Sequence, residues 1–315
     1  MNNKKAIALI SGGLDSILAA KIVNLQNIEV LGLHLTTPLW NQQEAIRNAK
    51  ELNIPLEIVD ISKSFLKILG SSHQQWCIMC RILMLKEAKK YLEKEHASFI
   101  ITGEVVGQNP KSQSRKILNL TAQKANVEGI ILRPLSGHLF PITIPEEKGW
   151  IRREKLLGIH GAKRTPQLEL ATCLGLSKEL TSTKGCLLTN NTYLRRLKDL
   201  LKYGHPQVND LELLKLGRHL RLSNTTKIII ARSQLEETRM SKLITKNDLV
   251  LKIENCPFTI MQGESINEEN IIKAATLYVK YSKVKYLPSV TVKYRYLGND
   301  SKEYSVVIPT LTGEK

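Results

Sequence analysis

The residues best suited to chemistry in this sequence form the run Ser11-Gly12-Gly13-Leu14-Asp15-Ser16. An apolar stretch at 6–10 predicts a buried strand before the run, and a helical pattern of apolar residues follows it from Ile17. The two glycines let the chain turn sharply and approach a ligand closely. We expect Asp15 or Ser16 to cap the helix, whose free N–H groups then face the loop. The run therefore predicts an anion site, and phosphate is the usual anion.

Cysteines are the second group of reactive side chains, and there are five: Cys77, Cys80, Cys173, Cys186 and Cys256. An odd number argues against a disulfide framework and favours metal, redox or catalytic use. The C-x-x-C spacing of Cys77 and Cys80 lets two thiolates reach one metal or one another. We place this pair just before a helix, whose dipole favours the thiolate. Cys173 and Cys256 are interpreted as small core residues.

Strands and helices alternate along the first 135 residues of the sequence. The expected strands lie at 6–10, 28–35, 56–59, 98–102 and 129–132, and the clearest helices lie at 41–52 and 81–95. This pattern predicts a doubly wound α/β fold, with a parallel five-stranded sheet and helices on both faces. Ligands bind at the carboxyl ends of such strands, so we expect the loop, His34, Asp60 and Thr102-Gly103-Glu104 to line one crevice.

The second half of the 315-residue chain has a different texture. Helices are expected at 150–157, from Thr165 onward and at 193–202. From residue 209 the pattern is α+β, with strands at 227–231, 249–253, 290–296 and 304–308 and a helix at 268–280. We therefore predict a domain at 1–175, a connecting segment at 176–208 that carries Cys186, and a smaller domain at 209–315.

The net charge is +17, from 46 Lys and Arg residues against 29 Asp and Glu residues. This excess indicates a polyanionic partner, with nucleic acid first, although a basic proteome or simple solubility is an alternative. No segment is long and apolar enough to span a bilayer, and no signal peptide is recognised. We therefore expect a cytoplasmic enzyme without membrane contact.

The loop resembles the pyrophosphate loop (PP-loop) Ser-Gly-Gly-x-Asp-Ser of the ATP pyrophosphatases, which split ATP into AMP and pyrophosphate and adenylate a substrate oxygen. The resemblance extends to Thr102-Gly103-Glu104, Gly107-Gln108, Ser112-Gln113 and Leu132-Arg133-Pro134-Leu135. These runs are similar to the tRNA thiouridine synthases, closest to the pyrophosphatase domain of tRNA 4-thiouridine synthase. The resemblance covers roughly residues 4–200 and implies an adenine nucleotide alpha hydrolase-like fold.

From residue 209 the chain resembles the RNA-binding domain of the NFACT ribosome-associated proteins. The likeness rests on the run from Lys227 to Ser233 and on the segment 274–283. Basic and aromatic residues interleave from Lys283 to Tyr296, where cations can contact phosphates and tyrosines can stack on bases. An equally open interpretation is a half-buried strand, with Val290, Val292, Tyr294 and Tyr296 inward and Thr291, Lys293 and Arg295 in water.

The resemblance implies an ATP-dependent tRNA thiouridine synthase that adenylates a uridine oxygen, at uridine 8 by likeness alone, and replaces it with sulfur. Its cofactors are ATP and Mg²⁺, and its partners are tRNA and a sulfur donor, either sulfide or a cysteine desulfurase; a homodimer is left open. The implied cofactor-binding residues are Ser11, Gly12, Gly13, Leu14, Asp15, Ser16, His34, Gly103 and Gln108. The implied catalytic residues are Asp15, Ser16, Cys186 and Cys80. RNA contacts are expected from Lys111, Arg115, Arg133, Lys293 and Arg295, with a structural ion pair as the alternative role of Arg133.

Three interpretations are open for Cys77, Cys80 and Cys186. In a subgroup of the resembling families, three cysteines hold a 4Fe-4S iron–sulfur cluster, whose open iron can bind hydrosulfide. Alternatively, Cys186 carries a persulfide that Cys80 or Cys77 resolves as a disulfide. Structural zinc, or no ligand, is the third. For the whole chain, the rivals are an amide- or nitrile-forming pyrophosphatase of small molecules and a non-catalytic RNA-binding protein of translation.

Overall fold

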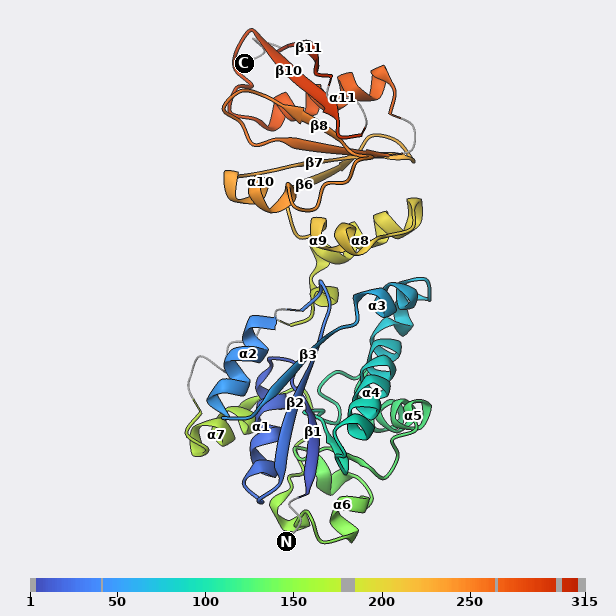
Figure 1. Cartoon of the computed structure of the whole chain (residues 1–315), viewed down its shortest axis with the longest axis vertical. Helices are drawn as coiled ribbons and strands as arrows, with labels where there is room; N and C mark the ends of the chain where they lie inside the picture. The colour runs from blue at the N-terminus through green and yellow to red at the C-terminus, as the bar shows by residue number, and fades with distance from the viewer. Residues whose placement is uncertain (1–3, 41, 177–184, 264–265, 299–301, 311–315) are drawn as a thin grey trace. The chain divides into compact units, whose positions relative to one another are not determined.

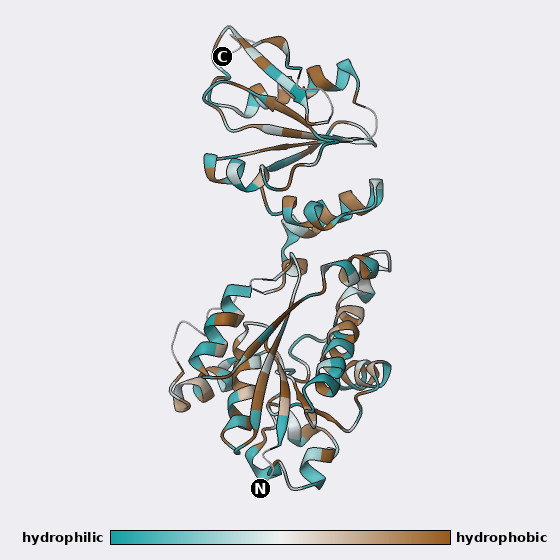
Figure 2. Ribbon diagram, viewed as in Figure 1, coloured by the Kyte–Doolittle hydropathy of each residue, from teal (hydrophilic) through white to brown (hydrophobic). Residues whose placement is uncertain are grey.

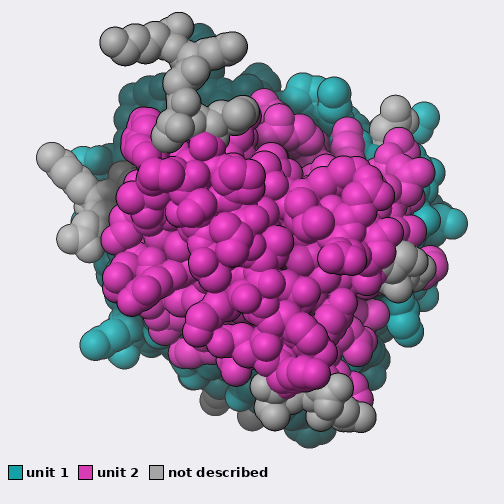
Figure 3. All heavy atoms as spheres, turned by 90° about the horizontal axis from the view of Figure 1, so that it is seen from above, with its two compact units in different colours: residues 1–189 teal, residues 190–315 magenta. Residues whose placement is uncertain are grey.

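The computed structural model describes residues 4–40, 42–176, 185–263, 266–298 and 302–310. The chain divides into two compact units, residues 1–189 and residues 190–315, which Figures 1 and 3 show. The division falls inside the segment 176–208, so Cys186 is part of unit 1. Within the described ranges, no helix combines the length and apolar character that crossing a membrane requires.

Unit 1 contains a parallel five-stranded sheet in the order β3-β2-β1-β4-β5. The strands are β1 (Lys5–Leu9), β2 (Glu29–Thr36), β3 (Leu56–Asp60), β4 (Phe99–Ile101) and β5 (Ile131–Leu132). The strand order reverses between β1 and β4, which is where such sheets bind ligands. The predicted doubly wound fold is confirmed.

Two layers of helices cover the two faces of this sheet. Successive strand residues point to opposite faces, and both faces carry apolar side chains that the helices bury. Apolar residues of α1 (Leu14–Asn24), α2 (Gln42–Glu51) and α7 (Thr165–Cys173) pack on the face that carries Ala6 and Ala8. Apolar residues of α4 (Trp76–Lys94) and α5 (Arg115–Ala125) pack on the face that carries Ile7 and Leu9. Figure 2 shows the apolar strands between these amphipathic layers.

Some predicted helices of unit 1 need correction. The helix expected at 81–95 begins at Trp76, after a 3-10 turn at His73–Gln75, so Cys77 and Cys80 lie inside the helix rather than before it. Residues 150–157 form a single 3-10 turn (Arg153–Lys155), because their neighbours bond elsewhere: the N–H of Leu157 donates to Pro134 O at 2.8 Å. The helices α3 (Ser62–Leu69), α5 and α6 (Ile144–Glu147) were not predicted.

Unit 2 contains an antiparallel six-stranded sheet in the order β11-β10-β8-β9-β7-β6. The strands are β6 (Arg218–Arg221), β7 (Thr226–Ile230), β8 (Leu249–Lys252), β9 (Thr259–Gly263), β10 (Ser289–Tyr296) and β11 (Tyr304–Pro309). Helix α11 (Glu268–Tyr281) packs on one face, and α10 (Gln234–Met240) with the residues that end α9 (Val208–Leu213) packs on the other. The predicted smaller α+β domain is confirmed, although β6, β9, α9 and α10 were not predicted.

The helix α8 (Asn191–Tyr203) precedes this sheet and is anchored to unit 2. Tyr193, Leu197 and Leu200 form its buried face. The Tyr193 hydroxyl donates to Leu211 O at 3.0 Å, and Arg196 donates to Leu214 O at 2.7 Å and Gly217 O at 2.9 Å.

Candidate active site

The loop Ser11–Ser16 joins β1 to α1 and is held by its own hydrogen bonds. Gly12 has a φ of +86°, which L side chains rarely adopt. The Ser16 hydroxyl donates to Gly13 O at 2.8 Å, and the Gly13 N–H donates to Ser11 Oγ at 3.2 Å. The predicted capping by Asp15 or Ser16 is wrong: Gly13 is the N-cap, and no side chain of the described residues caps this helix start. The positive end of α1 therefore faces the loop.

The Asp15 carboxylate is only half satisfied. Gln108 Nε2 donates to Asp15 Oδ2 at 2.9 Å, which orients the carboxylate. Its other oxygen, Oδ1, is buried and has no hydrogen-bond partner in the part of the chain that the structure describes. A buried, unpaired carboxylate oxygen is costly, so it indicates a cation that completes the site. Oxygen ligands of this kind, together with phosphates, are those that Mg²⁺ prefers, and the loop therefore fits Mg²⁺ and a nucleotide.

Two glycines let neighbouring elements close on this loop. A Cβ on Gly103 would lie 2.4 Å from both the carbonyl carbon of Asp15 and the nitrogen of Ser16, so the chain after β4 touches the start of α1. A Cβ on Gly12 would lie 2.9 Å from Glu44 Cβ of α2. Gly103, predicted to bind the cofactor, contributes to the site because it has no side chain that would push the loop away from the chain after β4.

Asn48 of α2 is a site residue that the sequence interpretation missed. Its Nδ2 donates to Gly12 O at 2.6 Å, and the residue is 1% exposed. A single polar residue on the otherwise apolar helix face of Ala45, Ala49 and Leu52 is the pattern that could have revealed it.

His34 and Asp60, both at strand ends, are placed differently. His34 is 1% exposed, and its Nδ1 lies 2.7 Å from Ile10 O, the carbonyl just before the loop. Burial lowers the pKa of His34 more than this bond raises it, so the ring is neutral, with Nδ1 donating and Nε2 left as a buried acceptor. The Asp60 carboxylate instead accepts the Ser62 N–H at 2.8 Å at the start of α3.

Glu104, beside Gly103, ties two arginines together. Its oxygens lie 2.5 Å from Arg81 Nε of α4 and 2.7 Å from Arg133 Nε. Burial raises the pKa of Glu104, but the Arg133 and Arg81 guanidinium groups outweigh it and hold the pKa below its ordinary value. Arg133 is 5% exposed and also donates to Leu118 O at 3.1 Å. The predicted RNA contact at Arg133 therefore needs correction, because this buried side chain already forms an ion pair with Glu104.

The three cysteines of interest lie near one another in unit 1. Cys77 and Cys80 are one turn apart on α4, and Cys186 is close enough to raise the pKa of the Cys80 thiol. Burial, followed by Cys186 and Cys77, raises the pKa of the Cys80 thiol to about 12, against a smaller effect of Arg81. Burial also raises the pKa of Cys186, although the Leu188 N–H and the Trp40 indole stabilise its thiolate. The expectation that a helix dipole favours the thiolate therefore fails at Cys80, where burial dominates.

The donor set of this cysteine group has the right chemistry for an iron–sulfur cluster or a soft metal. Among the described residues, however, no three Cys, His, Asp or Glu side chains are already arranged to hold a metal ion. The predicted cluster thus stays a prediction. Of the other two cysteines, Cys256 is buried as predicted, whereas Cys173 is exposed, so its prediction as a core residue is wrong.

The remaining predicted RNA contacts lie on the surface of the two units. Lys111 and Arg115 are exposed just before and at the start of α5. On β10, Lys293 and Arg295 are exposed, and Lys293 Nζ pairs with Glu303 Oε2 at 3.0 Å. Val290 and Val292 are buried beneath them, as expected for a half-buried strand, whereas Tyr296 is 38% exposed rather than inward.

Both parts of the chain are similar to known proteins. Residues 1–139 match the family model described as thiamine biosynthesis protein (ThiI), and residues 217–314 match the NFACT protein RNA binding domain. The curated relatives include a probable tRNA sulfurtransferase of Natranaerobius thermophilus, 28% identical in an alignment of 149 residues that covers 42% of this chain and 35% of the relative. A second, of Methanobrevibacter smithii, is 29% identical in an alignment of 180 residues that covers 52% of this chain and 46% of the relative.

A solved 4-thiouridine synthetase–RNA complex with bound ATP is 22% identical, with a TM-score of 0.37, covering 67% of this chain and 52% of that one. The chain spans less than half the length of the curated relatives named above. The resemblance predicted from the sequence is nevertheless confirmed for both parts. Residues 1–139 match the ThiI family model, and residues 217–314 match the NFACT RNA-binding model.

Proposed function

We propose that this protein is an ATP-dependent tRNA sulfurtransferase, which adenylates a uridine carbonyl oxygen and replaces it with sulfur. The observation that carries the proposal is the buried, unpaired Asp15 Oδ1 beside the uncapped start of α1. Relatives named probable tRNA sulfurtransferase support the substrate class, and so does the net charge of +17. The proposed division of labour assigns nucleotide chemistry to 1–175, the connecting segment with Cys186 to 176–208, and RNA binding to 209–315.

In the first step, the uridine oxygen attacks the α-phosphorus of ATP, forming a new O–P bond while the bond to pyrophosphate breaks. The loop N–H groups and the positive end of α1 stabilise the charge that develops on the phosphates. Asp15, oriented by Gln108, would hold Mg²⁺, which supplies further charge neutralisation when bound. Gly103 keeps Asp15 and Ser16 in place by direct backbone contact.

In the second step, sulfur attacks the activated carbon, the C–O bond breaks, and AMP leaves. Cys77, Cys80 and Cys186 would hold the 4Fe-4S cluster, which supplies an iron that binds hydrosulfide. Both routes need thiolates, and burial raises the pKa of Cys80 and Cys186, so cluster binding would have to displace their protons. A persulfide on Cys186, resolved by Cys80 or Cys77, is the alternative route. The proposed sulfur source is sulfide or a cysteine desulfurase.

Mass spectrometry of tRNA nucleosides from a deletion strain and its parent tests the proposal. We expect loss of 4-thiouridine, from position 8 by resemblance, with recovery on complementation by the intact gene but not by Asp15→Asn or Cys186→Ala. Cys173→Ala, which changes an exposed cysteine of the same unit, is the matched control and should restore it. Loss of a 2-thiouridine instead would keep the chemistry and move the target. Unchanged thionucleosides, with no second thiolase gene, would overturn the proposal in favour of a small-molecule pyrophosphatase.

A further inference from the structure

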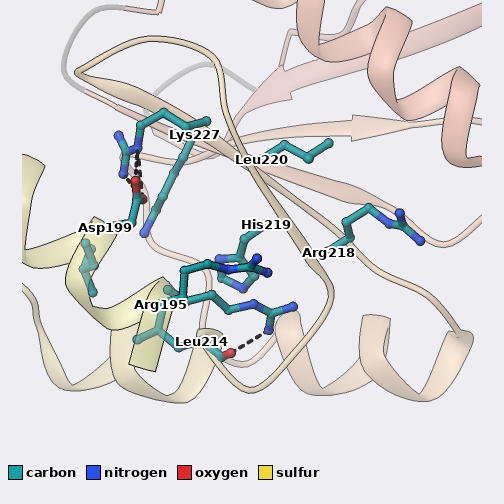
Figure 4. A pocket seen from close by; sticks show the side chains of 10 residues that line it. Arg195, Asp199, Leu214, Arg218, His219, Leu220 and Lys227 are labelled. Carbon is teal, nitrogen blue, oxygen red and sulfur yellow. Dashed lines mark hydrogen bonds and ion pairs between the residues drawn. The ribbon is translucent and has the colours of Figure 1, made fainter. Parts of the chain in front are cut away.

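A basic pocket of about 380 Å³ lies within unit 2, between α8 and the strands β6 and β7 (Figure 4). Its charged lining residues are Arg195, Arg196 and Asp199 of α8, Arg218 and Arg221 of β6, and Lys227 of β7. Five cations thus share a pocket with one carboxylate. Helix α8 lies outside the residues that match either family model, so this wall of the pocket belongs to neither matched domain.

The single carboxylate of the pocket is already committed to Arg221. Arg221 Nε lies 2.9 Å from both Asp199 oxygens, and its terminal nitrogen lies 2.6 Å from Oδ2. The Arg221 guanidinium also lies over the Tyr203 ring, 4.5 Å from its centroid. Arg196 is likewise fixed, by its hydrogen bonds to two backbone carbonyls. The pocket therefore presents two rigid guanidinium groups and keeps a surplus of positive charge.

Lys227 has no such partner. Figure 4 shows its side chain reaching from β7 toward the helix that carries Asp199. It is half-buried, and among the described residues its ammonium makes no hydrogen bond or ion pair at contact distance. In the sheet register Lys227 lies directly opposite Arg221, and like charges in that position destabilise a sheet. Burial lowers the pKa of Lys227, and Arg221 adds to this, while Asp210, Asp199 and Asp248 act in the opposite direction.

The imidazole of His219 adds hydrogen bonds to this pocket rather than charge. Its Nε2 lies 3.1 Å from Leu213 O and 3.0 Å from Leu216 O, so Nε2–H donates to backbone carbonyls. Burial, helped by Arg196 and Lys227, lowers the pKa of His219 to about 3, and the ring is neutral. The positive charge thus comes from the arginines and from Lys227.

We infer that this pocket binds a phosphate group of RNA, with Lys227 as its main ligand and the fixed guanidinium groups of Arg196 and Arg221 in the same lining. A phosphate supplies the anionic partner that Lys227 lacks and offsets its repulsion with Arg221. Arg195 and Arg218 are exposed and would contact the neighbouring phosphates of the same RNA strand. The inference rests on the proposed function only for the identity of the RNA as tRNA.

Binding of unmodified tRNA to the full chain, followed by fluorescence anisotropy across a KCl series, tests the inference. We expect Lys227→Met to bind about ten-fold more weakly at low salt, because a charge-assisted contact is lost. The slope of log affinity against log salt should fall by roughly one. Lys280→Met removes one exposed charge from α11 of the same unit and is the matched control. Equal affinity and equal slope for the two variants would overturn the inference.

Two further measurements keep the test independent of folding and of the proposed reaction. Arg195→Gln changes an exposed side chain and should reduce the salt slope without changing the unfolding temperature. ATP binding in the absence of RNA, measured by calorimetry, should be unchanged in Lys227→Met, because the loop belongs to unit 1; failure of the nucleotide site and failure of the pocket are therefore distinguishable. Repeating the titration with tRNA that lacks its 5′-phosphate identifies the source: an unchanged Lys227 effect indicates an internal phosphodiester, and a lost effect indicates the terminal phosphate.

Discussion

The loop of unit 1 and the basic pocket of unit 2 each leave one charged group unsatisfied, but the two groups have opposite signs. In the loop, a buried carboxylate oxygen of Asp15 lacks a partner, and the surrounding donors are backbone N–H groups and a helix end. In the pocket, the Lys227 ammonium lacks a partner at contact distance among the described residues, and its neighbours are guanidinium groups. The first arrangement suits a metal–nucleotide complex, and the second suits a nucleic acid backbone.

The two sites also differ in how the chain builds them. The loop comes from six consecutive residues, and its neighbours Gly103 and Gln108 belong to runs recognisable in the sequence. The pocket gathers four residues from α8, four from β6 and Lys227 from β7, together with Leu214. A site built on backbone geometry needs a fixed local sequence, whereas a site built on side-chain charge needs only residues that the fold brings together.

The largest expected effect is on the loop alone. Asp15→Asn removes the charge that we assign to Mg²⁺ binding and should lower ATP–pyrophosphate exchange by about 10²- to 10³-fold. The affinity for tRNA should stay unchanged in this variant, in contrast to Lys227→Met. A variant that keeps nearly full exchange activity would remove the basis for the comparison, since the unpaired oxygen would then have no catalytic use.

Glu104→Gln should destabilise unit 1 by about 3–5 kcal/mol, because it leaves the buried Arg133 and the partly buried Arg81 without their shared carboxylate. Urea unfolding, with one probe in each unit, should show the loss in unit 1 only. The matched control is Glu269→Gln, which breaks the exposed pair with Lys273 in unit 2 and should have no measurable effect. Equal small losses for both variants would show that the Glu104 network is not structural.

The same carboxylate predicts a pH dependence. Because the folded state holds the pKa of Glu104 below its ordinary value of 4.5, its contribution is complete above that pH. The contribution is lost as the pH falls further, through the folded-state pKa. Unfolding measurements at neutral and acidic pH should therefore show the wild type and Glu104→Gln converging in acid. A stability difference between them that does not change with pH would contradict this assignment.

The smallest expected effect concerns the support of the loop. Asn48→Ala leaves the carbonyl of Gly12 without its donor and should cost about 1–2 kcal/mol of stability. The apparent affinity for ATP should weaken more than the stability falls if Asn48 positions the loop. Asn48→Asp, which has the same shape but replaces the N–H donor with a buried carboxylate, should be at least as damaging as the alanine variant. ATP titration of both variants by calorimetry checks the prediction, and unaltered ATP affinity would refute it.

Much of this architecture was predictable, because it depends on local patterns. Apolar stretches of strand length predicted all five strands of the parallel sheet, and two glycines before a helical pattern predicted the loop. The start of α4 was missed because the stretch from Trp76 to Cys80 has no N-cap residue and its apolar residues fit a helix or a loop equally well. The segment 150–157 has a helical pattern, but its neighbours bond with residues near Pro134, which no local rule anticipates.

The charged networks could not be predicted, because their partners are far apart in sequence. Glu104 was recognised within a motif, but its two arginines come from α4 and from the residue after β5. Likewise, Asp199 and Arg221 are both in an evidently basic region, yet their pairing depends on how α8 packs on the sheet. Residue types indicated which chemistry is available, and only the three-dimensional contacts showed which charges are left over.

The dipeptide Gly103-Glu104 connects the loop Ser11–Ser16 to helix α4 within unit 1. Gly103 lies directly against the backbone of Asp15, and the Glu104 carboxylate forms an ion pair with Arg81, the residue after Cys80 on α4. Only one peptide bond separates these two attachments. A displacement of the loop backbone at Asp15 would therefore be transmitted to α4, which carries Cys77 and Cys80. In the proposed reaction, the loop and the cysteine group would therefore keep a fixed spacing, and the substrate base would have to move between them.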